Sequence, residues 1–140
     1  MRSGLALLTL CLTLCGCNVS SSGDSGNQDA QQLVAAFHTK LDREQYQQIW
    51  DESDKLMHDS ANAAEMIKLM AVIHRKLGPV RVSNQLGWRE NRGSNGHVIE
   101  VLMETAFDKG TGKESFVFIE NGGTSRLGGY HINSNDMMLN

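Results

Sequence analysis

The spacing of apolar residues changes at Gly78-Pro79, and this change restricts the chain to a fold with separate helical and strand halves. Before this point apolar side chains recur roughly every three to four residues, which is typical of helices packed through one face. Beyond it they alternate with polar residues, as in Val98–Phe107, which predicts strands with one buried face. Helices followed by a run of strands indicate an α+β domain whose sheet packs on the helices.

Three helices are predicted before this point, each from an apolar stripe that follows a capping pair. They are Asp29–Leu41, a second helix that starts from the Asp42/Gln45 cap and continues to Met57, and Asn62–Leu77, which Gly78-Pro79 terminates. Leu69 and Val72 widen the apolar face of the third helix, so we expect it to be the most buried of the three.

Three strands are predicted after the helices, with a fourth candidate before them. They are Val98–Phe107, Phe116–Ile119 and Leu127–Ile132, and the candidate first strand is Val80–Trp88. The segments between the last three strands are rich in turn residues, which favours an antiparallel meander. The predicted fold is therefore α+β, with three N-terminal helices packed on a three- to four-stranded antiparallel sheet.

The first 16 residues have the pattern of a signal peptide, with Arg2 as the positive region and Leu5–Leu14 as the apolar region. This apolar run is too short for a permanent bilayer span, which needs about 20 residues. Leu14-Cys15-Gly16-Cys17 resembles the lipobox of bacterial lipoproteins, which implies diacylglycerol on Cys17 and usually a further acyl chain such as palmitate. The alternative is an ordinary secretory leader with incidental cysteines.

Residues 17–28 are predicted to be the lipidated cysteine and a flexible tether, because they are rich in Ser and Gly. Such a tether has a span of roughly 18 Å, so the single domain, residues 29–140, stays close to the membrane. Asn18 stands where Asp would suggest retention at the inner membrane, which favours the outer membrane. We therefore expect a lipid-anchored protein of the bacterial envelope that faces the periplasm.

The composition excludes several classes of function. All three cysteines, Cys11, Cys15 and Cys17, lie in the leader segment, so the domain has none left to form a disulfide. The formal charge of −3 becomes −4 once Arg2 leaves with the leader, and no cluster of Lys and Arg offers a nucleic-acid surface. The five histidines lack metal-ligand spacing, so neither a metal nor another cofactor is expected.

Short motifs spread along the chain resemble a family of small bacterial lipoproteins, grouped as domain of unknown function 4019. They are Ala36-Phe37, Tyr46, Trp50, Arg75-Lys76-Leu77-Gly78 with Arg81, Thr105-Ala106-Phe107, Glu114 and Gly129-Tyr130-His131-Ile132. The resemblance covers about residues 30 to 133. It implies a fold similar to nuclear transport factor two or to cystatin, and an envelope location. It implies no chemistry, because the function of the family is itself unassigned.

Two classes of function remain open. The first is a non-catalytic domain that binds an envelope protein or a small apolar ligand, for example as an inhibitor or immunity protein. Its predicted anchors are Tyr130, Trp88 and Arg126, because binding energy concentrates in aromatic and Arg side chains. The second is a small hydrolase or isomerase in which an acid and a base converge in a pocket. Its candidate residues are Tyr130, His131, His74 and Asp54. The partner and the oligomeric state stay open.

Overall fold

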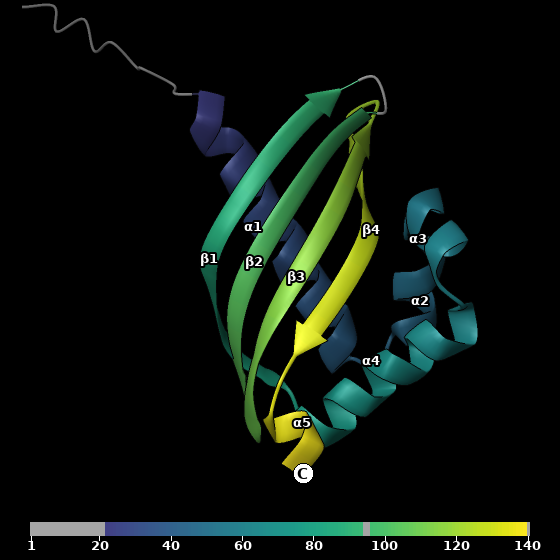
Figure 1. Cartoon of the computed structure of the whole chain (residues 1–140), viewed down its shortest axis with the longest axis vertical. Helices are drawn as coiled ribbons and strands as arrows, with labels where there is room; N and C mark the ends of the chain where they lie inside the picture. The colour runs from purple at the N-terminus through teal and green to yellow at the C-terminus, as the bar shows by residue number, and fades with distance from the viewer. Residues whose placement is uncertain (1–21, 94–95, 140) are drawn as a thin grey trace, which may run out of the picture.

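The computed structural model describes residues 22–93 and 96–139, so the predicted signal peptide and Cys17 lie outside the described residues. Within these ranges, four helices precede a four-stranded sheet and a short helix follows it (Figure 1). The bounds are α1 Ser22–Asp42, α2 Tyr46–Asp51, α3 Lys55–Ser60, α4 Ala63–Leu77, β1 Val80–Gly93, β2 Gly96–Phe107, β3 Gly110–Asn121, β4 Thr124–Asn133 and α5 Asp136–Leu139. The predicted α+β class is confirmed. None of the described helices combines the length and the apolar character that a membrane crossing requires.

The four strands lie in chain order and each pairs antiparallel with the next, which confirms the predicted meander. The turn between β3 and β4 is made by Gly122 and Gly123, whose φ angles of 59° and 78° suit a tight hairpin between twisted strands. The strands are longer than the alternation of apolar residues predicts. The polar ends of the strands also pair, through backbone hydrogen bonds. Such pairing does not depend on the side chains, so the alternation of apolar and polar residues does not predict it.

The helices cover one face of the curved sheet, and α1 crosses that face diagonally (Figure 1). In β2, Val101 and Met103 are buried whereas Leu102 and Glu104 are exposed, so alternate residues point toward and away from the helices. We call these the inner and outer faces of the sheet. The inner face packs against a stripe on α1 that includes Val34 and Leu41, and the core lies between these two layers.

Helix α4 follows its sequence prediction closely, because local signals fix both of its ends. The side chain of Asn62 accepts hydrogen bonds from the backbone amides of Ala64 and Glu65 at the N-terminus. Gly78 ends the helix with a φ of 78°, a conformation that favours glycine. A Cβ atom at this position would also lie 3.0 Å from Cβ of Asp108, so a side chain has little room there.

The first helix begins at Ser22 instead of Asp29, so the part of the predicted tether from Ser22 onward is helical. The expected cap at Asp29 is therefore wrong. Asn27 accepts a hydrogen bond of 2.7 Å from the side-chain amide of Gln85 on β1. This contact joins the first half of α1 to the sheet. The sequence at the start of α1 is polar, so its local pattern does not predict that a distant strand holds it in a helix.

The prediction of a single second helix is also wrong, because α2 and α3 are separate and four helices precede the sheet. The backbone amide of Asp54 donates to the carbonyl of Leu127 on β4, at 2.8 Å, which interrupts the helix. The carboxylate of Asp54 then caps α3 by accepting from the amide of Leu56. The predicted cap at Asp42 is not formed either, since Asp42 accepts instead from the amide of Val80.

Candidate functional site

A buried carboxylate lies at the centre of the inner face. Glu114 on β3 is fully buried, at 0% exposure. One of its oxygens, Oε2, accepts a hydrogen bond of 2.5 Å from the Thr105 hydroxyl and lies 2.8 Å from Nε2 of His38. The other, Oε1, accepts from the Tyr130 hydroxyl at 2.6 Å, and Ser83 Oγ lies 2.7 Å from Thr105 Oγ1. We call these five residues the Glu114 cluster.

The fold explains why these residues meet. Ser83 and Thr105 are register partners on β1 and β2, so their side chains share the inner face. Glu114 and Tyr130 lie on the next two strands, and α1 presents His38 from the opposite layer. A buried carboxylate is costly unless hydrogen bonds and an opposite charge compensate it. Here two hydroxyls donate hydrogen bonds to the carboxylate, and an imidazole lies 2.8 Å from it.

Aromatic rings pack against His38 and Tyr130, two members of the cluster. The ring of Phe37 lies 5.1 Å from that of Phe116 and 4.7 Å from that of Tyr130, between ring centres. The imidazole of His38 meets Phe116 edge to face at 5.8 Å. Burial, together with the neighbouring Glu114, raises the pKa of the Tyr130 hydroxyl well above its ordinary range. Tyr130 therefore stays protonated and donates its hydrogen to Glu114.

A cavity of about 470 Å³ lies between α1 and β1, beside the cluster. Its lining is Gln31, Val34, Ala35, His38, Ser83, Asn84, Gln85 and Met103. The side chain of Gln85 accepts a hydrogen bond from Gln31 on α1, at 3.0 Å, which joins the two walls. Two members of the cluster, His38 and Ser83, reach this cavity. In the part of the chain that the structure describes, no group is hydrogen-bonded to the second ring nitrogen of His38, Nδ1.

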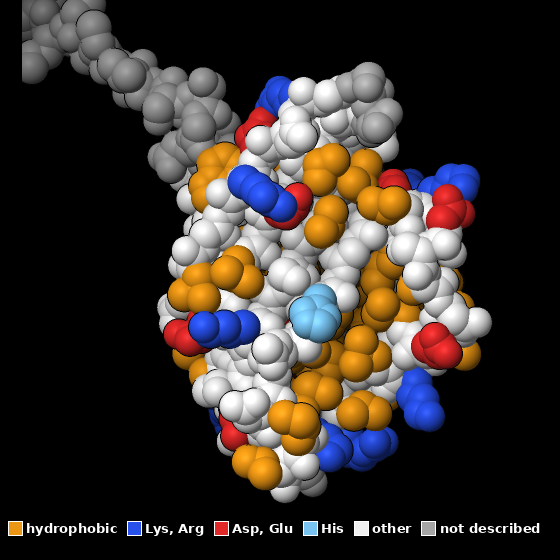
Figure 2. Space-filling model, in the orientation of Figure 1, with side chains coloured by type: hydrophobic (Ala, Val, Ile, Leu, Met, Phe, Trp, Pro, Cys, Tyr) orange, Lys and Arg blue, Asp and Glu red, His pale blue; other side chains and the backbone are white. Residues whose placement is uncertain are grey.

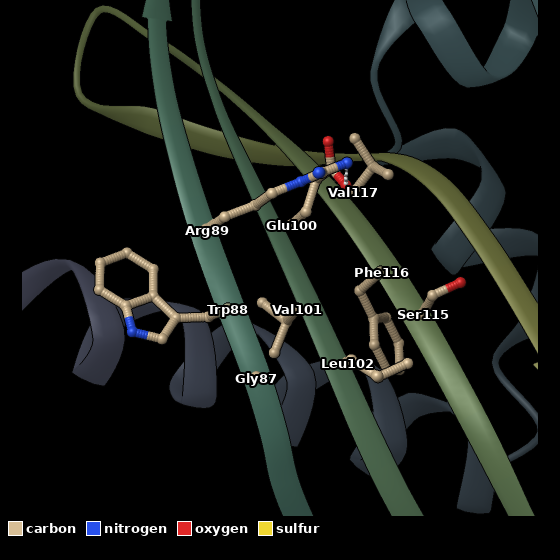
Figure 3. Close-up of a pocket in the computed structure, with 9 residues that line it drawn as sticks. All are labelled: Gly87, Trp88, Arg89, Glu100, Val101, Leu102, Ser115, Phe116 and Val117. Carbon is tan, nitrogen blue, oxygen red and sulfur yellow. Dashed lines mark hydrogen bonds and ion pairs between the residues drawn. The ribbon is translucent and has the colours of Figure 1, made fainter.

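A second hollow, of about 330 Å³, lies on the sheet where β1, β2 and β3 run side by side (Figure 3). Arg89 extends across it to Glu100, with 2.6 Å between the guanidinium and the carboxylate. The outer face nearby exposes about half of Val82, Leu86 and Leu102. Figure 2 shows hydrophobic side chains mixed with charged ones on this face of the molecule. Such a surface suits contact with another macromolecule better than it suits a small ligand.

The three predicted binding residues lie apart. Tyr130 belongs to the Glu114 cluster, and Trp88 packs half-buried against the core from β1. Arg126 is exposed on β4, beside a narrow groove that Lys40 and Glu52 also line. The fold therefore joins neither Trp88 nor Arg126 to the buried cluster.

The four residues considered for catalysis do not come together either. Tyr130 points to the inner face, whereas its neighbour His131 is exposed on the outer face. His74 lies in the last turn of α4, 3.7 Å from the carboxylate of Glu44, and Asp54 caps α3. Among the described residues, no group of three or more His, Cys, Asp or Glu side chains is arranged to hold a metal ion.

Sequence reasoning missed the pairing of His38 with Glu114, although both residues carry a local signal. Glu114 occupies the same alternating phase as the buried Phe116 and Phe118, so a charged residue interrupts an apolar face. His38 lies one helical turn from Val34 and Leu41 on the apolar stripe of α1. A carboxylate and an imidazole on facing apolar surfaces indicate a buried pair.

The fold and the site define a small α+β domain with a ligand-sized cavity beside a buried histidine–carboxylate pair. No protein-family model and no curated protein matches the chain.

Proposed function

We propose that the chain is an envelope-anchored lipoprotein whose domain binds a small ligand in the cavity between α1 and β1. One observation carries the proposal: His38 lines the cavity of about 470 Å³, and the buried Glu114 holds its ring through Nε2. Ligand pockets commonly have volumes of about 300 to 1,000 Å³ and combine apolar walls with a few fixed polar groups. A ring already held in place loses little freedom when a ligand arrives.

The lining supports a ligand that is partly apolar. Val34, Ala35 and Met103 supply apolar surface, and the thioether of Met103 adapts easily to different shapes. The remaining lining residues are amides, one hydroxyl and one imidazole, so His38 is the only ionisable side chain among them. The cavity therefore favours an uncharged molecule that has both apolar surface and a few polar groups.

The envelope location is the second part of the proposal. The lipobox-like segment that ends at Cys17 supports lipidation there, and Asn18 favours the outer membrane. The layer of helices on a curved four-stranded sheet supports a fold similar to nuclear transport factor two or to cystatin. The short motifs between residues 30 and 133 are the basis on which we propose membership in the family of domain of unknown function 4019.

The test is a fragment screen by amide NMR on the full-length protein in lipid nanodiscs. We expect bound fragments to shift the signals of Val34, Ser83 and Met103. Ala35→Trp places a large ring in the cavity and should abolish these shifts. Ala64→Trp, on an exposed position of α4, is the matched control and should leave them unchanged. Fragments that bind Ala35→Trp as well as the parent protein would place the site elsewhere.

The pair of His38 and Glu114 also favours a second candidate, a small pocket enzyme. In many enzymes a buried carboxylate orients an imidazole that acts as a general base through its other nitrogen. His38 has this arrangement, and Nδ1 is the nitrogen that would face a substrate. Mass spectrometry of a ligand recovered after incubation separates the two candidates, because a binding protein returns the molecule unchanged and a hydrolase or isomerase converts it.

A further inference from the structure

The outer face of the sheet is partly apolar and open along β1 and β2. The helices cover the inner face, on the other side of the sheet (Figure 1). On the outer side, Val82, Leu86 and Leu102 each expose about half of their surface. Figure 2 shows hydrophobic side chains gathered among charged ones on this side of the molecule. Exposed apolar side chains that are grouped in this way are typical of a contact surface.

A recess and a projecting leucine lie next to each other on this face. Gly87 on β1 and Leu102 on β2 are register partners, and both line the hollow of about 330 Å³ (Figure 3). A Cβ atom at Gly87 would have no atom within 4 Å apart from its chain neighbours, so the space above this glycine is open. Adjacent strands lie about 4.8 Å apart, so the half-exposed side chain of Leu102 stands directly beside the recess.

A charged pair lies two residues further along the same two strands. Arg89 and Glu100 are also register partners, and 2.6 Å separates the guanidinium from the carboxylate. The side chain of Arg89 is 77% exposed, so its other N–H groups are accessible to a second carboxylate. The side chain of Glu100 is 41% exposed, and a carboxylate accepts more than one hydrogen bond. Each member of the pair therefore has room for a second partner of opposite charge.

These features complement themselves when two copies of the chain meet face to face. Consider a two-fold axis that runs along the strands, midway between β1 and β2. Register partners lie at equal distances on either side of this axis, so each outer residue faces its own register partner in the second copy. Arg89 of each copy then meets Glu100 of the other, which gives a ring of four alternating charges. Leu102 of each copy enters the open space above Gly87 of the other.

The neighbouring positions agree with the same axis. Asn84 lies opposite Glu104 of the second copy, and an amide N–H group donates readily to a carboxylate. Val82 lies opposite Ala106 of the second copy, which extends the apolar contact. Packed sheets usually cross at about 30°, which displaces a residue two positions from the centre by roughly 4 Å. The long side chain of Arg89 accommodates such a shift.

We propose that the outer face of β1 and β2 is an interface between two copies of this chain, with Leu102 of each copy seated over Gly87 of the other. Because the axis runs along the strands, the start of α1 lies at the same end of the dimer in both copies (Figure 1). The proposed attachment of both copies to one membrane requires this arrangement. The interface is separate from the cavity between α1 and β1, so this inference does not depend on ligand binding.

The first test is sedimentation velocity of the full-length protein in density-matched detergent micelles, over a series of protein concentrations. Two strands from each copy form a contact below the standard size, so we expect a dissociation constant of about 10 to 100 µM. Gly87→Trp fills the recess that the other copy needs, and should weaken association at least about tenfold. Ala64→Trp, on an exposed position of α4, is the matched control and should associate as the parent does.

The second test exchanges charges between two chains. Arg89→Glu gives an acidic face and Glu100→Arg a basic one, so each variant alone should dimerise at least about tenfold more weakly than the parent. An equimolar mixture of the two restores opposite charges at every contact, and should form a mixed dimer with an affinity within about threefold of that of the parent. Arg126→Glu makes the same change of charge on β4, outside the interface. This control should dimerise as the parent does.

Three results would overturn the proposal. The first is a parent protein that stays monomeric up to about 500 µM. The second is a dimer that Gly87→Trp leaves unchanged, because such a dimer uses another surface. The third is a mixture of Arg89→Glu and Glu100→Arg that stays monomeric. Circular dichroism of each variant separates a lost dimer from a lost fold, and the concentration series on the parent needs no variant at all.

Discussion

Replacing Glu114 with alanine removes the acceptor that holds three buried groups in place. The Thr105 hydroxyl, the Tyr130 hydroxyl and the His38 ring each lose their contact with the carboxylate. The two hydroxyls have no other acceptor to turn to, because Thr105 is fully buried and the ring of Tyr130 packs against Phe37 and Phe116. The variant therefore leaves unsatisfied polar groups in the core as well as a space where the side chain was.

The expected loss of stability follows from these contacts. An unsatisfied buried polar group costs about 1 to 3 kcal/mol, and breaking a buried ion pair costs about 3 to 5 kcal/mol. Since the contributions overlap, we expect Glu114→Ala to lower the free energy of unfolding by about 3 to 5 kcal/mol. For a domain of this size, each kcal/mol shifts the melting temperature by roughly 3 to 6 °C. The midpoint should therefore fall by at least about 10 °C.

The measurement is thermal and urea unfolding followed by circular dichroism. Glu104→Ala is the control, because Glu104 is an exposed carboxylate on the neighbouring strand. Its removal should change the free energy of unfolding by less than about 0.5 kcal/mol. Tyr130→Phe, alone and combined with Glu114→Ala, completes a double-mutant cycle that isolates their shared hydrogen bond. A Glu114→Ala protein as stable as the Glu104→Ala control would refute the view that the cluster is a tightly bonded unit.

Two further predictions concern alkaline pH and membrane attachment. Because burial raises the pKa of Tyr130, the folded protein keeps this proton longer than the unfolded chain does, so stability should fall as the pH rises above about 10, the ordinary value for tyrosine. Urea unfolding between pH 9 and 11 measures this loss, and Tyr130→Phe should reduce it; an equal loss in that variant would assign the effect to other groups. Cys17→Ala should abolish labelling with a clickable fatty acid and release the protein from membranes. Undiminished label on this variant would contradict the lipobox interpretation.

Local signals explain which parts of the fold the sequence predicts correctly. Helix α4 has a capping asparagine at one end and Gly78 at the other, and both act within a few residues. The meander follows from alternation along single strands and from the turn residues between them. The break between α2 and α3 depends on a bond from Asp54 to Leu127, which are far apart in the chain. No periodic pattern within one segment contains that information.

The site escaped prediction for the same reason. His38 and Glu114 are 76 positions apart, and their contact exists only once α1 lies across the inner face of the sheet. Alternation on β4 does predict that Tyr130 and His131 point to opposite faces, and the structure places Tyr130 inside. What the pattern does not give is the partner of Tyr130. That partner is a carboxylate on the adjacent strand, which resembles a misplaced polar residue when the sequence is considered alone.

The Glu114 cluster is a costly way to fill a core whose described residues include no cysteine and no group of three or more His, Cys, Asp or Glu side chains placed to hold a metal ion. Well-packed apolar side chains in place of a buried ion pair are often neutral or stabilising, so stability alone gives no reason to keep these groups. We therefore expect the combined variant His38→Leu, Thr105→Val, Glu114→Leu and Tyr130→Phe, which also removes the hydroxyl that would lose its acceptor, to fold with a melting temperature near or above that of the parent, and to lose fragment binding at the cavity. Thermal melting and the amide NMR screen on the same sample measure both properties. A folded quadruple variant that still binds fragments at the cavity would show that the cluster serves the core and not the ligand.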